Sequence, residues 1–296
     1  MITNDLQKKI MTARKEWQAG DDRRDAGLPK TLAGVRRFDN LSYGPAGKWN
    51  LTDLYRPTDQ KKVPVIVNIH GGGWFYGTKE TYQFYGLALA QAGFGVVNFN
   101  YRLAPETSYP GAVEDVDLLL HWLVEQAANY QLDLNNVFLV GDSAGGQLAE
   151  QYLALYSNFI YRQLFGFAKP KLKIKAAALN CGVYFVLEND WNLDDLERAY
   201  FQPDLVEKYR EQLKIENYLT DQLPPLFIAT ANQDFLHNKA CQLDKWLTKQ
   251  QIKHVFKVYG DFSQPRRHDF QINQKDTLAK RCNEDELTFF KRYVTK

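Results

Sequence analysis

Apolar and β-branched runs of seven to nine residues recur along the chain, separated by longer stretches with apolar residues at helical spacing. The runs predict buried strands at residues 63–70, 93–101, 135–142, 173–181, 225–233 and 254–260. Helices are expected between them, at 80–93, 111–126, 144–156 and 236–250, followed by an amphipathic helix within 276–295. Because apolar strands alternate with crossover helices, the pattern predicts an α/β fold with a mostly parallel, doubly wound sheet and helices on both faces.

Two stretches interrupt this alternation. Residues 1–34 are polar with a helical pattern, and residues 182–223 form a long, charged insertion between two strands. In a doubly wound sheet, an insertion at the carboxyl end of a strand lies over the binding site. We therefore divide the chain into an N-terminal helical segment (1–34), a core (35–181 and 224–296) and an insertion (182–223).

The composition excludes several classes of protein. Of the 296 residues 45% are hydrophobic and 24% charged, and the net charge of +2 gives no argument for binding nucleic acid or an anionic membrane. The longest apolar-leaning stretch, 176–187, is too short to span a bilayer, so we expect no membrane association and a cytoplasmic protein. Cys181, Cys241 and Cys282 share no spacing, which predicts buried, reduced thiols rather than disulfides or a zinc site.

The sequence GDSAG at 141–145 carries the strongest chemical signal. It follows a predicted strand and precedes a predicted helix, which is the context that G-x-S-x-G requires to place a serine at the apex of a sharp turn. An isolated match would often be an ordinary turn, but this context makes Ser143 the candidate nucleophile.

A serine nucleophile needs a base, and the chain has five histidines. His70 and His121 precede the serine; His70 is expected to hold its own loop by hydrogen bonds, and His121 lies within a helix. His237 opens a helix and His254 opens a strand at the opposite edge of the sheet. His268 remains, on a loop beyond the last strand, and is the candidate base.

The candidate acid is Asp234, which lies at the tip of the strand predicted for 225–233. Asp261 and Asp269 are rivals, although Asp269 adjoins His268 and is poorly placed to point at its neighbour's ring. The chain order of serine, aspartate and histidine is the one expected for an α/β hydrolase.

Three consecutive glycines follow the strand predicted for 63–70. Side-chain-free N–H groups let a developing oxyanion approach closely, so Gly72 and Gly73 are the expected donors, with Ala144 N–H as the third. Gly71 is expected to shape the loop. A phosphate-binding loop is the rival interpretation, but no G-K-[ST] follows these glycines.

Several motifs together resemble one known family. They are HGGGW (70–74), YRLAPE (101–106), PGAVED (110–115) and GDSAGG (141–146), together with Asp234 and His268. Over residues 60–290 the chain is similar to the hormone-sensitive-lipase-like α/β-hydrolase carboxylesterases. The resemblance implies an eight-stranded, mostly parallel sheet, a small helical cap built from the N-terminal segment and the insertion, and hydrolysis of small-molecule esters without metal or cofactor. It leaves room for a homodimer.

The expected function is that of a serine carboxylesterase acting through an acyl-enzyme. The motifs do not separate this activity from that of an amidase, a formamidase or a sugar deacetylase, because the acyl half of the reaction is common to all of them. A non-catalytic receptor is the other alternative, since the plant gibberellin receptor resembles the same family while lacking a working triad. Here all three triad candidates are present, which disfavours it.

Aromatic residues suggest a small acyl pocket. Trp74 and Phe75 follow the glycines, and Tyr184 and Trp191 lie in the insertion, so Trp74, Phe75 and Tyr184 are the candidate substrate-binding residues. The alternative is that these rings belong to the core, because aromatics make up 14% of the chain. The charged insertion also argues against a lipid-binding surface, so we expect short-acyl esters such as acetyl and butyryl to be preferred.

Overall fold

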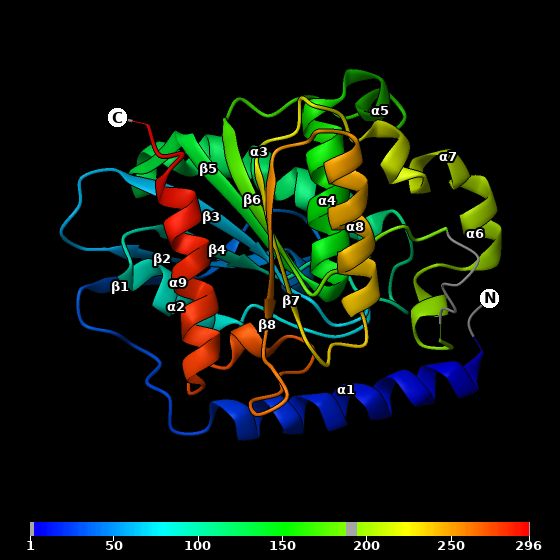
Figure 1. The fold of residues 1–296 in the computed structure, drawn as a ribbon, viewed down its shortest axis with the longest axis horizontal. Helices are drawn as coiled ribbons and strands as arrows, with labels where there is room; N and C mark the ends of the chain where they lie inside the picture. The colour runs from blue at the N-terminus through cyan, green and yellow to red at the C-terminus, as the bar shows by residue number, and fades with distance from the viewer. Residues whose placement is uncertain (1–2, 188–193, 296) are drawn as a thin grey trace.

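The computed structural model describes residues 3–187 and 194–295, and these residues contain one eight-stranded sheet with helices on both faces (Figure 1). The strand order is β1-β2-β4-β3-β5-β6-β7-β8. The strands are β1 (Val35–Ser42), β2 (Leu51–Pro57), β3 (Val63–Ile69), β4 (Gly95–Phe99), β5 (Leu132–Asp142), β6 (Ile174–Asn180), β7 (Leu226–Ala231) and β8 (His254–Tyr259). The predicted fold class is confirmed.

The six strands predicted from apolar runs are β3 to β8, and all of them pair in parallel. The pattern of residues missed β1 and β2, an antiparallel pair at one edge of the sheet. β1 is mostly polar, and none of its residues is buried. β2 is buried but contains Asp53, whose carboxylate forms a buried ion pair with Lys79 at 2.8 Å. Charged residues interrupt the apolar run by which a buried strand is predicted, and their partners become apparent only in the tertiary structure.

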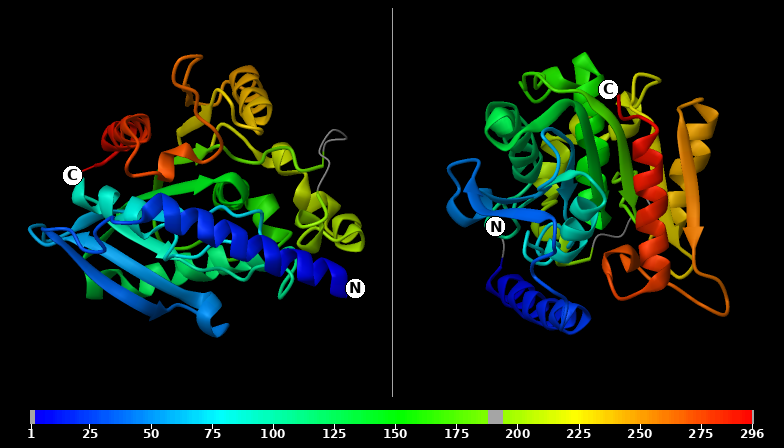
Figure 2. Two further views of the ribbon diagram at one scale, coloured as in Figure 1. Left: turned by 90° about the horizontal axis from the view of Figure 1, so that it is seen from below. Right: turned by 90° about the vertical axis from the view of Figure 1, so that its left-hand side faces the viewer.

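The helices form two layers around the sheet. They are α2 (Gln83–Gln91), α3 (Gly111–Tyr130), α4 (Ser143–Ser157), α5 (Phe159–Gln163), α8 (His237–Lys249) and α9 (Thr277–Lys291). Apolar residues of α3, α4 and α8 share one hydrophobic core with one face of the sheet, and those of α2 and α9 share a second core with the other face. Figure 2 shows this layering from two further directions.

The N-terminal segment and the insertion lie outside these layers. α1 (Asn4–Asp25) runs along one edge of the molecule, at the bottom of Figure 1, and buries only Ile10 and Asp25. The described part of the insertion contains η2 (Glu197–Ala199), α6 (Pro203–Lys208), α7 (Arg210–Leu213) and η3 (Ile215–Tyr218). Trp191 lies outside the described residues, and the division of the chain into cap and core stays a prediction.

Two expectations from composition concern the whole chain. Within the described residues, no helix combines the length and apolar character needed to cross a membrane. The three cysteines are unpaired, and Cys181 and Cys282 are buried. Cys241, on α8, is only half-buried, contrary to the prediction, and its Sγ lies 3.4 Å from His237 Nε2.

Candidate active site

The candidate site lies at the edge of the sheet where the parallel strands end. β5 ends directly before Ser143, Asp234 lies three positions beyond the end of β7, and His268 comes from the loop after β8. The glycines 71–73 follow β3. Because β3 to β8 all run in the same direction, these segments meet at one edge.

Ser143 occupies a tight turn between β5 and α4. Its φ of +51° is a left-handed conformation that is unfavourable for a residue with a Cβ. Gly145 allows the turn to pack against β3, because a Cβ at this position would lie 2.0 Å from the carbonyl oxygen of Ile69. The strand, turn and helix predicted around the serine are therefore all present, and the serine begins α4.

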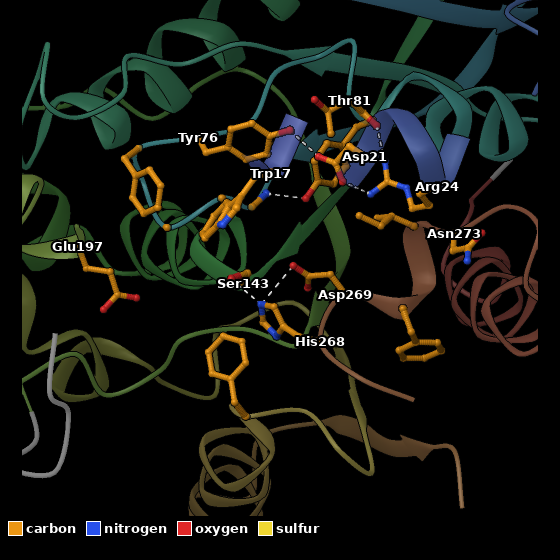
Figure 3. Close-up of a pocket in the computed structure, with 18 of the residues that line it drawn as sticks. Trp17, Asp21, Arg24, Tyr76, Thr81, Ser143, Glu197, His268, Asp269 and Asn273 are labelled. Carbon is orange, nitrogen blue, oxygen red and sulfur yellow. Dashed lines mark hydrogen bonds and ion pairs between the residues drawn. The ribbon is translucent and has the colours of Figure 1, made fainter. Parts of the chain in front are cut away.

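A chain of hydrogen bonds joins Ser143, His268 and Asp234. Ser143 Oγ lies 2.9 Å from His268 Nε2 (Figure 3), and His268 Nδ1 lies 2.7 Å from Asp234 Oδ1. The Asp234 carboxylate also accepts the backbone N–H of Leu236 at 2.9 Å and the hydroxyl of Thr230 at 3.1 Å. These donors fix the carboxylate, which in turn favours the His268 tautomer that carries its proton on Nδ1.

The two rival acids differ in their partners. Asp261 Oδ1 accepts the backbone N–H groups of Ser263 and Gln264 at 2.7 and 2.8 Å, within its own loop. Asp269 does reach the ring of His268, with its Oδ2 3.2 Å from Nε2. From the sequence we expected poor contact between these neighbours. The left-handed backbone of Asp269, at φ +52°, makes a sharp bend that no local pattern predicted.

The electrostatics of the hydrogen-bonded chain favour a charged histidine. Burial opposes the charged form of His268, but the charges of Asp269 and Asp234 outweigh burial and raise its pKa above the ordinary value. Burial also acts to raise the pKa of Asp234, yet the hydrogen bond from His268 holds that pKa below its ordinary value. Asp234 is therefore ionised at neutral pH and stabilises a proton on the imidazole.

The remaining histidines are engaged elsewhere. A ring nitrogen of His70 lies 2.7 Å from the carbonyl oxygen of Gly71. His121 and His237 likewise contact the carbonyl oxygens of Asp117 (2.9 Å) and Ala231 (3.1 Å). His254 Nε2 lies 3.0 Å from Asp244 Oδ1. His70 is fully buried, and burial lowers its pKa to about 4. It holds the start of the glycine loop as a neutral side chain, as predicted from its position.

The glycine loop presents free backbone N–H groups. Gly72 and Gly73 have φ angles of +117° and +57°, and the carbonyl of Gly72 accepts the N–H of Tyr76 at 2.8 Å. A Cβ on Gly72 would lie 2.2 Å from the carbonyl oxygen of Tyr76, so this turn requires glycine. Within residues 3–187 and 194–295, the N–H groups of Gly72 and Gly73 meet no acceptor. Ala144 N–H belongs to the first turn of α4, where helices leave donors unpaired.

Gly71 has a different role from its two neighbours. Its N–H donates to the hydroxyl of Tyr82 at 3.0 Å, and that hydroxyl donates to Asp142 Oδ2 at 2.5 Å. Gly71 therefore anchors the loop to the residue before Ser143, which agrees with the expected shaping role.

A cavity of about 570 Å³ opens over Ser143 and His268 (Figure 3). Its further lining comprises Trp17, Asp21, Arg24, Gly71, Gly72, Gly73, Phe75, Tyr76, Thr81, Tyr82, Asp194, Glu197, Phe235, Asp269, Phe270, Ile272 and Asn273. The three residues from α1 were not predicted, because no local pattern shows where a polar helix packs. Phe235, 74% exposed beside the acid, was also missed.

The three aromatic candidates differ in whether they reach the cavity. Phe75 lines the cavity, whereas Trp74 and Tyr184 do not. Trp74 is fully buried, stacks on Tyr200 with ring centroids 5.9 Å apart, and donates from Nε1 to Gln147 at 3.1 Å. Tyr184 is also fully buried. Both belong to the core, which was the alternative interpretation of this aromatic-rich chain, so we withdraw them as substrate-binding residues.

One group of side chains could ligate a metal among the residues that the structure describes. Ligand atoms of Cys181, Asp234 and His268 lie within 4.8 Å of one another. A metal there would compete for the carboxylate and the ring nitrogen that form the 2.7 Å hydrogen bond. The donor set therefore fits the hydrogen-bonded pair better than a resident metal.

The parallel sheet flanked by helix layers, with a serine at the turn after β5, defines an α/β-hydrolase fold. Residues 52–247, more than half of the chain, match the model of the family described as BD-FAE. The chain belongs to the BD-FAE family, and the resemblance to hormone-sensitive-lipase-like hydrolases is confirmed.

Similar proteins include esterases. The esterase LipQ of Mycobacterium tuberculosis is 29% identical over 222 residues, 72% of this chain and 49% of LipQ. An acetyl esterase of Salmonella dublin is 27% identical over 251 residues, 81% of this chain and 75% of that protein. The chain therefore spans about half the length of LipQ, and it spans 37% of the esterase LipI.

The fold is also shared with solved structures. Esterase B from Lactobacillus rhamnosis superposes with a TM-score of 0.88, covering 98% of this chain and 97% of that one at 24% identity. This likeness of fold covers nearly the whole chain.

Proposed function

We propose that this protein is a serine carboxylesterase that hydrolyses small-molecule esters through an acyl-enzyme. The observation that carries the proposal is the hydrogen-bonded chain from Ser143 through His268 to Asp234, beside unpaired N–H groups and open to a cavity. Membership of the BD-FAE family and the esterase relatives support it.

In the first step Ser143 Oγ attacks the ester carbonyl while His268 Nε2 takes the hydroxyl proton. Asp234 stabilises the imidazolium through Nδ1–H. The N–H groups of Gly72, Gly73 and Ala144 donate hydrogen bonds to the carbonyl oxygen and stabilise the negative charge that develops on it. His268 then gives its proton to the leaving alcohol, and the ester C–O bond breaks.

In the second step water replaces the alcohol. His268 takes a proton from the water as its oxygen attacks the acyl carbon, and the same N–H groups stabilise the second tetrahedral intermediate. Transfer of the proton back to Ser143 releases the carboxylic acid and restores the hydroxyl.

The substrates proposed are short-acyl esters, such as acetates and butyrates. The cavity wall mixes rings such as Phe75 and Trp17 with charged groups such as Arg24, which does not suit a long alkyl chain. Among the relatives, one is named an acetyl esterase, and esterase B has been solved with a C4–C4 tributyrin phosphonate. The homodimer and the cellular location remain predictions.

The test is hydrolysis of nitrophenyl esters from acetyl to dodecanoyl, with a nitroanilide alongside, by the wild type and by Ser143→Ala. We expect kcat/KM to be highest for the short esters and to fall roughly 10⁴- to 10⁶-fold in Ser143→Ala. Ser157→Ala, which alters another serine of α4, is the matched control. Fluorophosphonate labelling that survives Ser143→Ala would reject the nucleophile, and faster turnover of the anilide or the dodecanoyl ester would reject the substrate class.

A further inference from the structure

The catalytic-site histidine has a second carboxylate neighbour. Nε2 of His268 lies 2.9 Å from Ser143 Oγ and 3.2 Å from Asp269 Oδ2 (Figure 3). Nδ1 of the same ring faces Asp234. Asp269 lines the cavity and is held in a left-handed conformation at φ +52°. Both ring nitrogens of His268 therefore face an acidic side chain.

Behind Asp269 lies another acid, Asp142, which directly precedes Ser143. Asp142 is only 2% exposed, and its Oδ2 accepts the Tyr82 hydroxyl at 2.5 Å. The Asp142 and Asp269 carboxyl groups are within hydrogen-bonding reach of each other. Asp269 Oδ1 is buried and, within the described residues, receives no N–H or hydroxyl donor. An acid proton on Asp142 would supply the missing donor.

Two adjoining buried carboxyl groups do not both ionise, because their like charges repel in a medium of low polarity. Burial and the neighbouring Asp269 raise the pKa of Asp142 well above its ordinary range. Burial also raises the pKa of Asp269, to about 6, with the charge of His268 opposing it. Asp142 therefore keeps the shared proton, and Asp269 is the member of the pair that ionises near neutral pH.

We propose that Asp269 is a positioning residue for His268: its carboxylate, held by the protonated Asp142, stabilises the imidazolium through Nε2–H while Asp234 does so through Nδ1–H. This inference rests on the proposed esterase function. When Ser143 attacks, its proton moves to Nε2, and Asp269 accepts a hydrogen bond from the new N–H. No proton passes to Asp269, so the proton remains on His268 for the leaving alcohol.

Several titratable groups face Asp269 and share in its titration. They are Asp142 at the end of β5, Tyr82 before α2, Cys181 after β6, Asp234 after β7 and His268 itself. Gln271 of η4 (Phe270–Ile272) is a neutral neighbour. The acidic limb of the pH–rate profile consequently reports this coupled set and not one residue.

The experiment compares kcat, KM and the acidic limb of the kcat/KM profile in the wild type, Asp269→Asn and Asp142→Asn. Asparagine tolerates a left-handed backbone, so Asp269→Asn removes the charge while keeping the shape. We expect kcat to fall about tenfold with little change in KM, and the acidic limb to move about one unit to lower pH, because His268 loses a neighbouring negative charge. Asp142→Asn mimics the protonated acid and should leave the limb in place.

A direct titration of His268 by NMR supplies a readout that does not depend on turnover. Its pKa should fall in Asp269→Asn and not in Asp142→Asn. Asp261→Asn, which removes an exposed charge from the same loop, controls for a general loss of charge.

The proposal is overturned if Asp269→Asn leaves both the limb and the NMR pKa unchanged, or if Asp142→Asn shifts them equally. If the wild type hydrolyses esters and Asp269→Asn leaves the acidic limb unshifted, only the proposed role of Asp269 is rejected. Ester hydrolysis that is absent in the wild type, or unaffected by Ser143→Ala, rejects the proposed function instead.

Discussion

At the scale of single residues, the partner of each histidine decides what it can do. His254 and His268 both pair with an aspartate, at 3.0 and 2.7 Å, but only His268 also lies beside a serine hydroxyl. His268→Asn should therefore lower kcat/KM for nitrophenyl acetate roughly 10⁴-fold or more, since no base would accept the serine proton. His254→Asn removes a comparable His–Asp pair and should retain turnover close to that of the wild type. Equal losses in the two variants, measured on protein with native circular dichroism, would contradict the assignment.

At the scale of elements, α1 is fastened beside the glycine loop by polar contacts of Arg14 together with one aromatic contact. Arg14 donates from Nε to the carbonyl of Phe75 at 2.7 Å and forms an ion pair with Glu106 at 2.7 Å, and Trp17 packs on Phe75 with ring centroids 4.9 Å apart. Arg14→Ala should release the loop that carries the oxyanion donors and lower kcat/KM about three- to tenfold, because misplaced donors lose part of their effect. Arg23→Ala, at an exposed position of the same helix, is the control in the same ester assay. Turnover by Arg14→Ala that matches the control would show that α1 does not position the loop.

At the scale of the whole molecule, Glu286 links α2 and α9, the two helices of the second core, to the sheet. It is fully buried in α9, where it accepts hydrogen bonds from Tyr85 of α2 and Asn180 of β6, both at 2.8 Å. Burial raises its pKa from 4.5 to about 7. The folded state therefore binds a proton that the unfolded state releases between these values, and the free energy of unfolding should fall as pH rises through this window. Glu286→Gln should reduce this pH dependence and raise the free energy of unfolding at pH 8 by about 1–3 kcal/mol. Urea unfolding of both proteins at pH 5 and pH 8 measures this effect. If the free energy of unfolding differs between the two pH values by the same amount in Glu286→Gln and in the wild type, Glu286 is not the source of the pH dependence.

Local patterns in the sequence carried the prediction of the parallel strands and of the segments that end at the site. A continuous apolar run marks a strand buried on both faces, and a serine between a strand and a helix needs no distant partner to be noticed. His268 was identified by elimination among five histidines, and Asp234 by its place at a strand tip. Each inference used only chain order and periodicity, which are properties of neighbouring residues.

The tertiary structure decided which side chains meet across elements. Asp142 and Asp269 are separated by more than a hundred residues, and no periodicity reveals that their carboxyl groups meet beside His268. Trp74 and Phe75 are adjacent in the chain and both are buried, yet only Phe75 lines the cavity. Side-chain direction in a loop depends on backbone angles and on distant partners that supply contacts and hydrogen bonds. The sequence by itself therefore determined the fold class and the candidate nucleophile, base and acid, while three-dimensional packing determined the wall of the cavity and the charges around the histidine.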